Sequence, residues 1–392
     1  MENNGYEIFS GLFGHARGDA LPGARVMKII EVTNVDFSLR QFLLPLMRGL
    51  RARGHEVIGV AAEGAHLAAA RAEGFRITPV PMARSLSPRA QIRAYRALLA
   101  LFRAERPDLV HAHMPISGFL ARLAARRAGV KHIAYTSHGF LFNQPAPWLR
   151  RVAALAMEFL AARWTTIHLT VSSEEADQAR RWHIHKHSIA IGNGRDPRHF
   201  HPDPAARARI RAELGVAQDQ VVVIAIARLV RHKGWPELLA AMREVAAELW
   251  VVGERLPTDH GADMEPYFAA SGLGPRLRRL GYRTDIAALL AASDIFALPS
   301  HFEGLPMSVI EAMLCALPVV ATAIRGPREQ VVEGETGLLV PPATIPPLAA
   351  ALQRLASDAG LRARMGQAGR NRALARYDEA VVIARTLDLL GA

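Results

Sequence analysis

The sequence predicts an α/β protein made of two doubly wound parallel-sheet domains. Short runs rich in β-branched residues alternate with longer Ala/Leu/Arg stretches of helical period, a rhythm typical of parallel β-α-β units. The rhythm begins near residue 27 and restarts after residue 215. With 392 residues, half of them hydrophobic, the chain has about the right length for two such Rossmann-like domains.

The predicted strands follow one another at similar spacing in both halves. In the first half they lie at 26–33, 56–62, 75–80, 109–113, 132–138 and 166–172, with helical stretches at 39–54 and 88–106. In the second half they lie at 221–229, 247–254, 277–283, 294–300, 318–324 and 337–342, with a helical stretch at 234–246. Ligands of such sheets bind at the carboxyl ends of the strands. We therefore expect a central cleft between the two domains to hold the site.

The predicted domain borders follow from this pattern. We expect an N-terminal domain at 27–200 and a C-terminal domain at 201–375, joined by a Pro- and His-rich linker near 196–205. Residues 1–26 are expected to be a disordered extension, and residues 376–392 a C-terminal helix that returns to the N-terminal domain.

Composition narrows the class of protein. The single cysteine, Cys315, rules out an internal disulfide and fits a reducing cytoplasm. Apolar runs stay shorter than the roughly 18–20 residues of a membrane span. Residues 1–200 hold 27 Lys and Arg against 15 Asp and Glu, a balance of +12, whereas residues 201–392 hold 21 of each. An anionic partner of the first half explains this asymmetry, and so does a genome that uses Arg freely on solvated helices.

The segment "ARLVRHKG" at 227–234 places two cations at a strand-to-helix junction. Arg228 leaves the strand end, and Lys233 precedes Gly234 and the next helix. Cations beside a helix N-terminus suit a diphosphate, because Arg can bind two oxygens at once while Lys acts as a point charge. Two solvated surface cations would give the same pattern. The chain has no GxxxxGK[ST] motif, and no GxGxxG follows the first strand, which argues against a P-loop enzyme and against a nicotinamide or flavin enzyme.

The segment "FEGLPMSVIEAM" at 302–313 carries two glutamates. Glu303 lies in the loop after a predicted strand, and Glu311 lies in the first turns of the helix that follows. Carboxylates accept hydrogen bonds from the paired hydroxyls of ribose and hexose. Backbone N–H groups at Gly304 and Leu305 are free to face a phosphate, since neither residue is proline. An ordinary capping glutamate and a solvated one would also fit this turn chemistry.

Two groups of histidines raise the question of a metal. The tract His183, His185 and His187 would line one face of a strand, but no cysteine or carboxylate accompanies it, so surface or acceptor-side histidines are the better interpretation. His111 and His113 end a predicted buried strand, where they would satisfy loop hydrogen bonds or reach the cleft. A DxD motif in a suitable loop is absent as well. We therefore predict no metal site.

Several motifs in the same order resemble the family-4 retaining glycosyltransferases, which have the GT-B fold. The resemblance rests on "HFEGLPMSVIEAMLCALPVVATAIRGPREQVVEGETGLLVPP", with its Glu, seven residues and second Glu, and on "ARLVRHKGW", "GYRTDIAALLAASDIFALPS" and "HGF" at 138–140. It covers about residues 27–375 and points to the branch that builds capsules, exopolysaccharides and lipid-linked oligosaccharides. One departure concerns the Gly-Gly loop that many members carry after the first strand. Here that loop reads "TNVDFSLRQ", where Asn34, Asp36 and Ser38 are candidates for part of its work.

The resemblance implies a role for each matching residue. Arg228 and Lys233 would hold the donor diphosphate, Glu311 the ribose hydroxyls, and Glu303 with the backbone of Gly304 and Leu305 the donor sugar. Arg283 would lie near the base, and His138 near the anomeric carbon. The implied catalytic set is therefore His138, Glu303, Arg228 and Lys233.

The expected reaction moves a hexosyl or N-acetylhexosaminyl group from a nucleotide-diphospho-sugar, expected to be a UDP-sugar, to an acceptor hydroxyl. Configuration would be retained, with no metal and no cofactor. The rival enzymes are a sugar-nucleotide epimerase and a phosphorylase on the same scaffold. Lys233, the one lysine after residue 200, would have to hold the phosphorylase's pyridoxal phosphate, but its place fits a diphosphate better. A basic nucleic-acid-binding protein is the alternative from another class, although the chain lacks basic patches interleaved with aromatics.

The basic first half of the chain also suggests binding to a membrane surface. Apolar helix-like sequence near residue 150 is flanked by Trp148, Trp164, Arg150, Arg151 and Arg163. Basic and aromatic residues around an amphipathic helix suit anionic lipid, although a buried core helix would give the same composition. We expect a cytoplasmic enzyme, peripheral on the inner face of the plasma membrane, with a glycan or polyprenyl-diphosphate-linked acceptor and no nucleic-acid partner.

Overall fold

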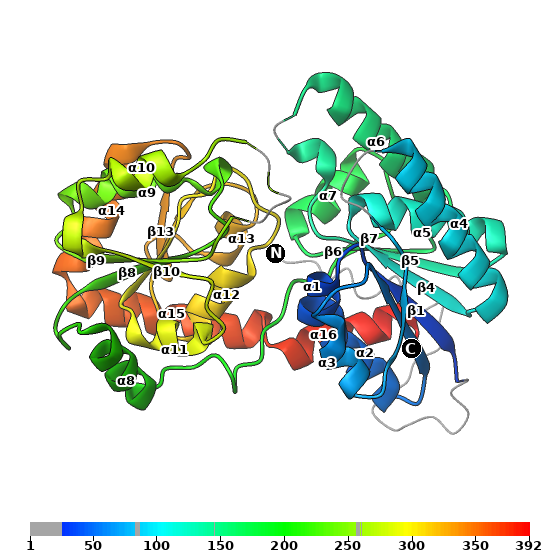
Figure 1. Ribbon diagram of the computed structural model, residues 1–392, viewed down its shortest axis with the longest axis horizontal. Helices are drawn as coiled ribbons and strands as arrows, with labels where there is room; N and C mark the ends of the chain where they lie inside the picture. Colours follow the sequence, from blue (N-terminus) through cyan, green and yellow to red (C-terminus); the bar gives the residue numbers. More distant parts are fainter. Residues whose placement is uncertain (1–25, 83–86, 145, 256–258, 260) are drawn as a thin grey trace. The chain divides into compact units, whose positions relative to one another are not determined.

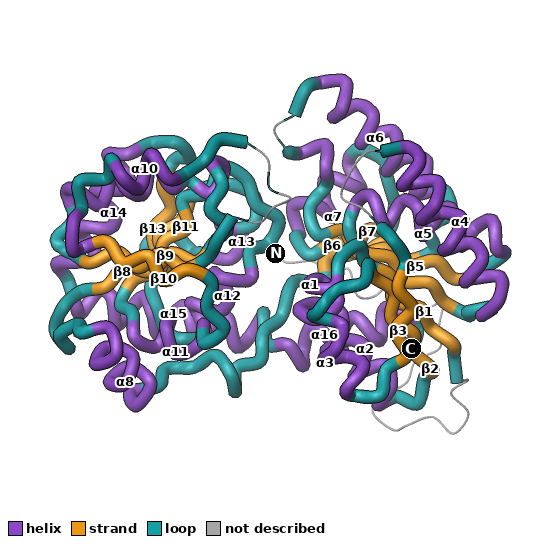
Figure 2. Tube along the Cα trace, viewed as in Figure 1, coloured by secondary structure: helices purple, strands orange, loops and turns teal. Residues whose placement is uncertain are grey.

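The computed structural model describes residues 26–82, 87–144, 146–255, 259 and 261–392 (Figure 1). The predicted extension at 1–26 therefore lies outside the described residues, except for Val26. The strands form two sheets, and helices pack around each of them (Figure 2).

The first sheet has seven strands in the order β3-β2-β1-β4-β5-β6-β7. Its strands are β1 (Lys28–Val32), β2 (Glu56–Ala61), β3 (Arg76–Pro79), β4 (Leu109–His113), β5 (His132–Ser137), β6 (Ile167–Thr170) and β7 (Ser188–Ala190). The pairs β2–β3, β1–β2, β1–β4 and β4–β5 are parallel. All six strands predicted in the first half are confirmed. Strand β7 was not predicted, because three residues are too few to show a period.

The helices along the first sheet are α1 (Asp36–Ser38), α2 (Leu44–Ala52), α3 (Leu67–Ala72), α4 (Pro88–Glu105), α5 (Pro115–Ala128), α6 (Trp148–Ala162) and α7 (Ser173–Arg181). The single helix predicted at 39–54 is wrong in its first turn, where Leu39–Leu43 forms a short π-helical segment before α2. Pro45 lies at the start of α2 and has no N–H to donate to the carbonyl one turn back, so the regular ladder cannot run through this point.

The second sheet has six parallel strands in the order β10-β9-β8-β11-β12-β13. They are β8 (Val222–Ile226), β9 (Glu248–Val252), β10 (Leu277–Gly281), β11 (Ile295–Leu298), β12 (Val319–Thr322) and β13 (Gly337–Val340). Each matches a predicted strand. The chain reverses its direction of winding between β8 and β11, so this pair is the switch point at which doubly wound sheets bind ligands.

Helices cover the second sheet on both faces (Figure 2). One apolar core joins the sheet to α9 (Trp235–Ala241), α10 (Glu265–Ala269) and α14 (Ile345–Ser357). Another joins it to α8 (Pro204–Leu214), α11 (Ile286–Ala292) and α12 (Met307–Leu314). The remaining helices are α13 (Pro327–Gln330), α15 (Ala359–Arg376) and α16 (Glu379–Leu390). The predicted α/β class, with two doubly wound parallel sheets, is confirmed.

The chain groups into two compact units. One holds residues up to Thr136 together with Leu160–His168 and Ile383–Ala392, and the other holds Ser137–Phe159 and Leu169–Val382. In the first unit the end of α16 packs on α2, where a Cβ added to Gly49 would lie 2.8 Å from the Ile383 side chain. Among the described residues, no helix combines the length and the apolar character needed to cross a bilayer.

Candidate active site

A tight turn after β8 brings Lys233 to the carboxyl end of β11. Gly234 ends this turn with a φ of +78°, and a Cβ at that position would lie 2.0 Å from the Pro299 carbonyl oxygen. Only glycine allows this approach, because any side chain would collide with the backbone that leaves β11. The need for a glycine directly after Lys233 therefore has a steric cause.

Lys233 contacts Glu303 directly. Its Nζ lies 2.6 Å from Glu303 Oε1, and the Ser300 hydroxyl donates to the same oxygen at 2.7 Å. Both charged side chains are largely buried, with 16% and 10% of their surfaces exposed. Two residues predicted from separate motifs thus meet at the switch point of the second sheet. Ser300 was not among the predicted site residues, although its place three residues before Glu303 at a strand end could have indicated it.

His232 ties this turn to the loop that carries Glu303. Its ring stacks on Phe302 with centroids 4.5 Å apart, and its carbonyl accepts the backbone N–H of His301 at 2.8 Å. Burial, reinforced by the positive charges of Lys233 and Arg228, lowers the pKa of His232 to about 4. The ring is therefore neutral near pH 7 and serves as a packing surface.

Arg228 is held at the same strand end by its own partners. Its guanidinium pairs with Asp259, and its carbonyl accepts the Trp235 indole N–H at 2.8 Å. Since Trp235 is fully buried, the backbone of Arg228 is fixed even though the side chain is 43% exposed. A guanidinium has five N–H donors, so the pair with Asp259 leaves donors for a ligand.

The backbone of Gly304 lies against two other segments of the same unit. A Cβ there would lie 2.7 Å from the His138 carbonyl oxygen. On another side, a Cβ at Gly326 would lie 1.9 Å from the Gly304 carbonyl oxygen. The structure therefore brings the predicted His138 and Gly304 together. The carbonyl of the next predicted residue, Leu305, accepts a hydrogen bond from Asn193 at 2.8 Å.

Glu311 lies on α12 and is 9% exposed. Its Oε1 accepts a hydrogen bond from Arg195 Nε at 2.6 Å, and this arginine follows β7 without having been singled out by the sequence analysis. No motif links two residues that lie 116 positions apart, so only the fold could find this pair.

Burial and the nearby charge of Glu311 raise the pKa of Cys315 to about 12, so this thiol is not a reactive thiolate near pH 7.

Arg283 lies just after β10 and pairs with two acidic residues. It donates to Asp285 at 2.8 Å and 2.6 Å and lies 3.3 Å from Glu213. Hydrogen bonding to Asp285 raises the pKa of Arg283, so its charge is permanent. Its predicted place near the donor base remains a prediction.

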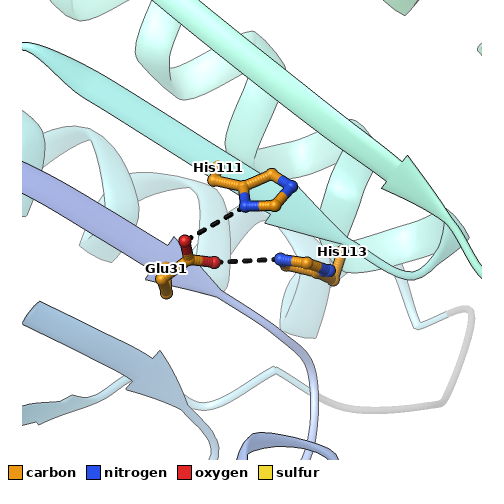
Figure 3. A group of neighbouring side chains, drawn as sticks. All are labelled: Glu31, His111 and His113. Atoms are coloured by element: carbon orange, nitrogen blue, oxygen red, sulfur yellow. Dashed lines mark hydrogen bonds and ion pairs between the residues drawn. The ribbon is translucent and has the colours of Figure 1, made fainter. Parts of the chain in front are cut away.

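A buried cluster joins the two switch strands of the first sheet (Figure 3). Glu31 on β1 holds one histidine of β4 with each carboxylate oxygen: Oε1 lies 3.1 Å from His111 Nδ1, and Oε2 lies 2.9 Å from His113 Nε2. The other nitrogen of His111, Nε2, lies 2.8 Å from the Thr136 hydroxyl. We expected these histidines to bond to loops or to reach the cleft, whereas their main partner is a carboxylate on the neighbouring strand.

This cluster is the one group among the described residues whose ligand atoms lie close enough to hold a metal ion. Hydrogen bonds already join the three side chains, and all of them are buried. Burial alone would raise the pKa of Glu31, but the charges and hydrogen bonds of His111 and His113 lower it to about 2. Burial lowers the pKa of His113 to about 4. The cluster is thus a satisfied hydrogen-bond network around an ionised carboxylate.

The histidine tract at 183–187 does not form the strand considered in the sequence analysis. These residues lie in turns between α7 and β7, and His183 has a positive φ of 55°. Both His183 and His187 are exposed. The interpretation as surface histidines agrees with this placement.

Comparison with known proteins decides the family. Residues 206–372 match the model of "Glycosyl transferases group 1", and residues 39–194 match that of "Glycosyl transferase 4-like domain". The chain is also 30% identical to the putative glycosyltransferase EpsD of Bacillus subtilis over 93% of this chain and 96% of that protein. The chain belongs to the group 1, or family-4, glycosyltransferases. The epimerase and the nucleic-acid-binding alternatives are not favoured by these relatives.

Other relatives of this glycosyltransferase act on cell-surface glycans by name. It is 24% identical to the capsular polysaccharide biosynthesis glycosyltransferase CapM of Staphylococcus aureus, over 91% of this chain and 94% of that one. Among solved structures, Anabaena HepE in complex with UDP and glucose superposes with a TM-score of 0.79 at 22% identity, covering 93% of this chain and 99% of HepE. At this level of identity the likeness supports the GT-B fold alone.

Proposed function

We propose that this glycosyltransferase moves a hexosyl or N-acetylhexosaminyl group from a UDP-sugar to a hydroxyl of a lipid-linked or polysaccharide acceptor. The transfer retains the anomeric configuration and needs neither a metal ion nor a cofactor. The observation that carries the proposal is the 2.6 Å contact between Lys233 and Glu303 at the switch point of the second sheet. It joins a cation suited to a diphosphate with a carboxylate suited to sugar hydroxyls.

The two basic residues provide the electrostatic part of the reaction. When the bond between the anomeric carbon and the diphosphate oxygen breaks, negative charge grows on the leaving phosphate. Lys233 and Arg228 stabilise that charge in place of a metal ion. An ammonium group has three N–H donors, so Lys233 can bond Glu303 and a phosphate oxygen at once. The acceptor oxygen attacks from the same face, and its proton passes to the leaving phosphate.

The carboxylates provide the recognition part. Glu303, oriented by Ser300 and Lys233, accepts hydrogen bonds from the donor sugar and acts as an anchor rather than as a nucleophile. Glu311, oriented by Arg195, accepts hydrogen bonds from the ribose hydroxyls. His138 lies on the sugar side in this proposal, which is supported by the packing of its backbone on Gly304.

The names of relatives support the donor and the acceptor. The chain is 29% identical, over 62% of its length and 65% of the relative's, to an Escherichia coli enzyme named "UDP-Gal:alpha-D-GlcNAc-diphosphoundecaprenol alpha-1,3-galactosyltransferase". A Mycolicibacterium smegmatis relative, 30% identical over 68% of this chain, is named as GDP-mannose-dependent, which makes a GDP-sugar the second candidate donor. The proposed location is the cytoplasmic face of the membrane, where a nucleotide-sugar and a polyprenyl-diphosphate-linked acceptor meet.

Thermal shift against a panel of nucleotides tests the donor. We expect UDP to raise the unfolding midpoint of the wild type, because a ligand that binds only the folded state stabilises it. Glu311→Gln should lose most of this shift. Glu265→Gln, which removes an exposed carboxylate paired with Arg279, should keep it. Stabilisation by GDP with none by UDP would assign the second candidate donor instead.

A further inference from the structure

A buried carboxyl outside the predicted site holds the turn that carries His138. Glu175 lies in the first turn of α7 and is 1% exposed. Its Oε1 accepts the backbone N–H of Phe140 at 2.8 Å, and the Ser137 hydroxyl lies 3.5 Å from its Oε2. The two contacts bracket His138 and Gly139. One side chain therefore ties both ends of the turn.

The backbone conformation of the Ser137–Phe140 turn is tightly constrained. Gly139 has a φ of +122°, a region that L side chains rarely adopt, and its N–H lies 3.4 Å from the Ser137 hydroxyl oxygen. Phe140 is buried and stacks on Phe142 with centroids 4.9 Å apart. The His138 carbonyl also packs on Gly304, next to Glu303. A shift at Phe140 would therefore move the histidine relative to the sugar-binding loop.

We propose that Glu175 is a positioning residue for sugar transfer, whose carboxyl fixes the Ser137–Phe140 turn and through it the place of His138. This role rests on the proposed function of His138 on the donor-sugar side. Glu175 acts through the Phe140 N–H and not by contact with the substrate. Small displacements of reacting groups reduce turnover far more than they reduce binding.

The surroundings of Glu175 make its hydrogen bond with the Phe140 N–H depend on pH. Burial raises the pKa of Glu175 to about 7; the Phe140 N–H and the charge of Arg325 oppose this rise, and the buried Glu158 adds to it. An ionised carboxylate accepts a hydrogen bond more strongly than a neutral carboxyl. Loss of the proton near pH 7 should therefore tighten the turn, and the wild-type kcat should rise through this range.

Three variants separate positioning from packing. Glu175→Leu removes the acceptor at similar size and should lower kcat roughly 10²-fold, the scale for a misplacement of about 1 Å, with the donor KM changed less than about threefold. Glu175→Gln keeps an acceptor oxygen and should restore most of kcat, but without the rise near pH 7. The control is Asp177→Ala, which removes an exposed carboxylate paired with Arg180 on the same helix and should match the wild type.

Hydrogen exchange of the segment Ser137–Asn143 gives a readout that needs no donor. The Phe140 amide should exchange faster in Glu175→Leu than in the wild type and Glu175→Gln. A leucine variant with wild-type kcat and unchanged exchange overturns the inference. Should that variant not fold, Glu175→Gln decides, because a wild-type pH profile in this variant also overturns it. A wild type that neither binds nor uses a nucleotide-sugar would refute the proposed function instead, and the exchange result would still stand.

Discussion

At the scale of single residues, Lys233 is the position on which the proposed chemistry depends most. Its ammonium is 2.6 Å from Glu303 and is mostly shielded from water, so its interaction with a phosphate would be stronger than at the surface. Lys233→Ala should lower kcat by roughly 10²–10³-fold, the scale for losing one stabiliser of transition-state charge. Steady-state rates with the preferred nucleotide-sugar measure this effect.

Arg228→Ala should have an effect of the same size for the same reason. The matched control is Arg209→Ala on α8, which removes an exposed arginine paired with Glu213. This control should keep wild-type rates. Full activity in either Lys233→Ala or Arg228→Ala would remove that residue from the diphosphate site.

Gly234 is a steric requirement that can be separated from ordinary backbone strain. Both Gly234 and Gly215 have positive φ, but a Cβ at Gly215 meets nothing within 4 Å, whereas one at Gly234 would collide with Pro299. Gly215→Ala should cost about 1–2 kcal/mol, the price of a left-handed alanine. Gly234→Ala should cost several-fold more and also reduce turnover, because Lys233 must move. Urea denaturation with activity assays compares the two; equal losses would contradict the steric argument.

At the scale of elements, α6 begins with an exposed apolar segment. Three large apolar side chains in its first turns face solvent, with Trp148 69%, Leu149 62% and Val152 54% exposed, while the small Ala154 and Ala161 are buried. The alternative of a core helix is therefore wrong for these large residues. Trp148 and Val152 are spaced to share one face, and basic residues flank them, which suits an anionic lipid surface.

Liposome flotation at low salt tests this helix. The protein should float with anionic vesicles, because each basic residue near such a surface contributes on the order of 1 kcal/mol. Changing both Trp148→Ser and Leu149→Ser should abolish flotation, and Arg150→Glu should weaken it. Leu374→Ser, at an exposed apolar position on α15, should have no effect. A wild type that stays in the soluble fraction would refute membrane binding and leave the transferase function untouched.

At the scale of the whole molecule, two buried groups should give the stability opposite dependences on pH. The pKa of His113 is lowered to about 4 from its ordinary value of 6.5. The contribution of His113 to the free energy of unfolding is therefore complete above pH 6.5 and is lost as pH falls toward 4. The pKa of Glu175 is raised to about 7 from its ordinary value of 4.5. The contribution of Glu175 to the free energy of unfolding is therefore complete below pH 4.5 and is lost as pH rises through 7. Between pH 7 and 4.5 the two trends oppose each other.

The wild-type unfolding midpoint should therefore change little from pH 7 to pH 4.5. Glu175→Gln should lose stability on acidification over this range, and His113→Gln should gain it. Below pH 4.5 all forms that retain the cluster should lose stability, because the pKa of Glu31 is lowered to about 2. Thermal melts at half-unit pH intervals measure these slopes. Parallel slopes in the two variants would contradict the assignment.

The proposed metal-free transfer is also tested on the whole molecule. EDTA should leave the rate of the wild type unchanged, since Arg228 and Lys233 are proposed to do the work of a cation. The cluster of Glu31, His111 and His113 is the place to look if this expectation fails. Loss of activity that Mg²⁺ restores in the wild type would overturn the proposal of metal-free transfer.

The sequence by itself determined the strands of the two sheets and the charged residues of the candidate site. Strand periods and motif spacing are local properties, so they were sufficient to find β8, β11 and the "KG" and Glu-x₇-Glu elements. Local pattern also has limits, as shown by the π-helical turn at Leu39–Leu43 and by the missed strand β7.

Only the tertiary structure decided the partners. The pairs Lys233–Glu303, Arg195–Glu311 and Glu31–His111 join residues about 70 to 116 positions apart, which no periodicity in the chain connects. For Lys233–Glu303 and Glu31–His111, the partners meet because neighbouring parallel strands bring their carboxyl ends to one edge of a sheet. Glu175 is the clearest case: in the sequence it is one acidic residue among several on a polar helix. In the fold it accepts the Phe140 N–H, and burial raises its pKa to about 7 although this hydrogen bond opposes the rise.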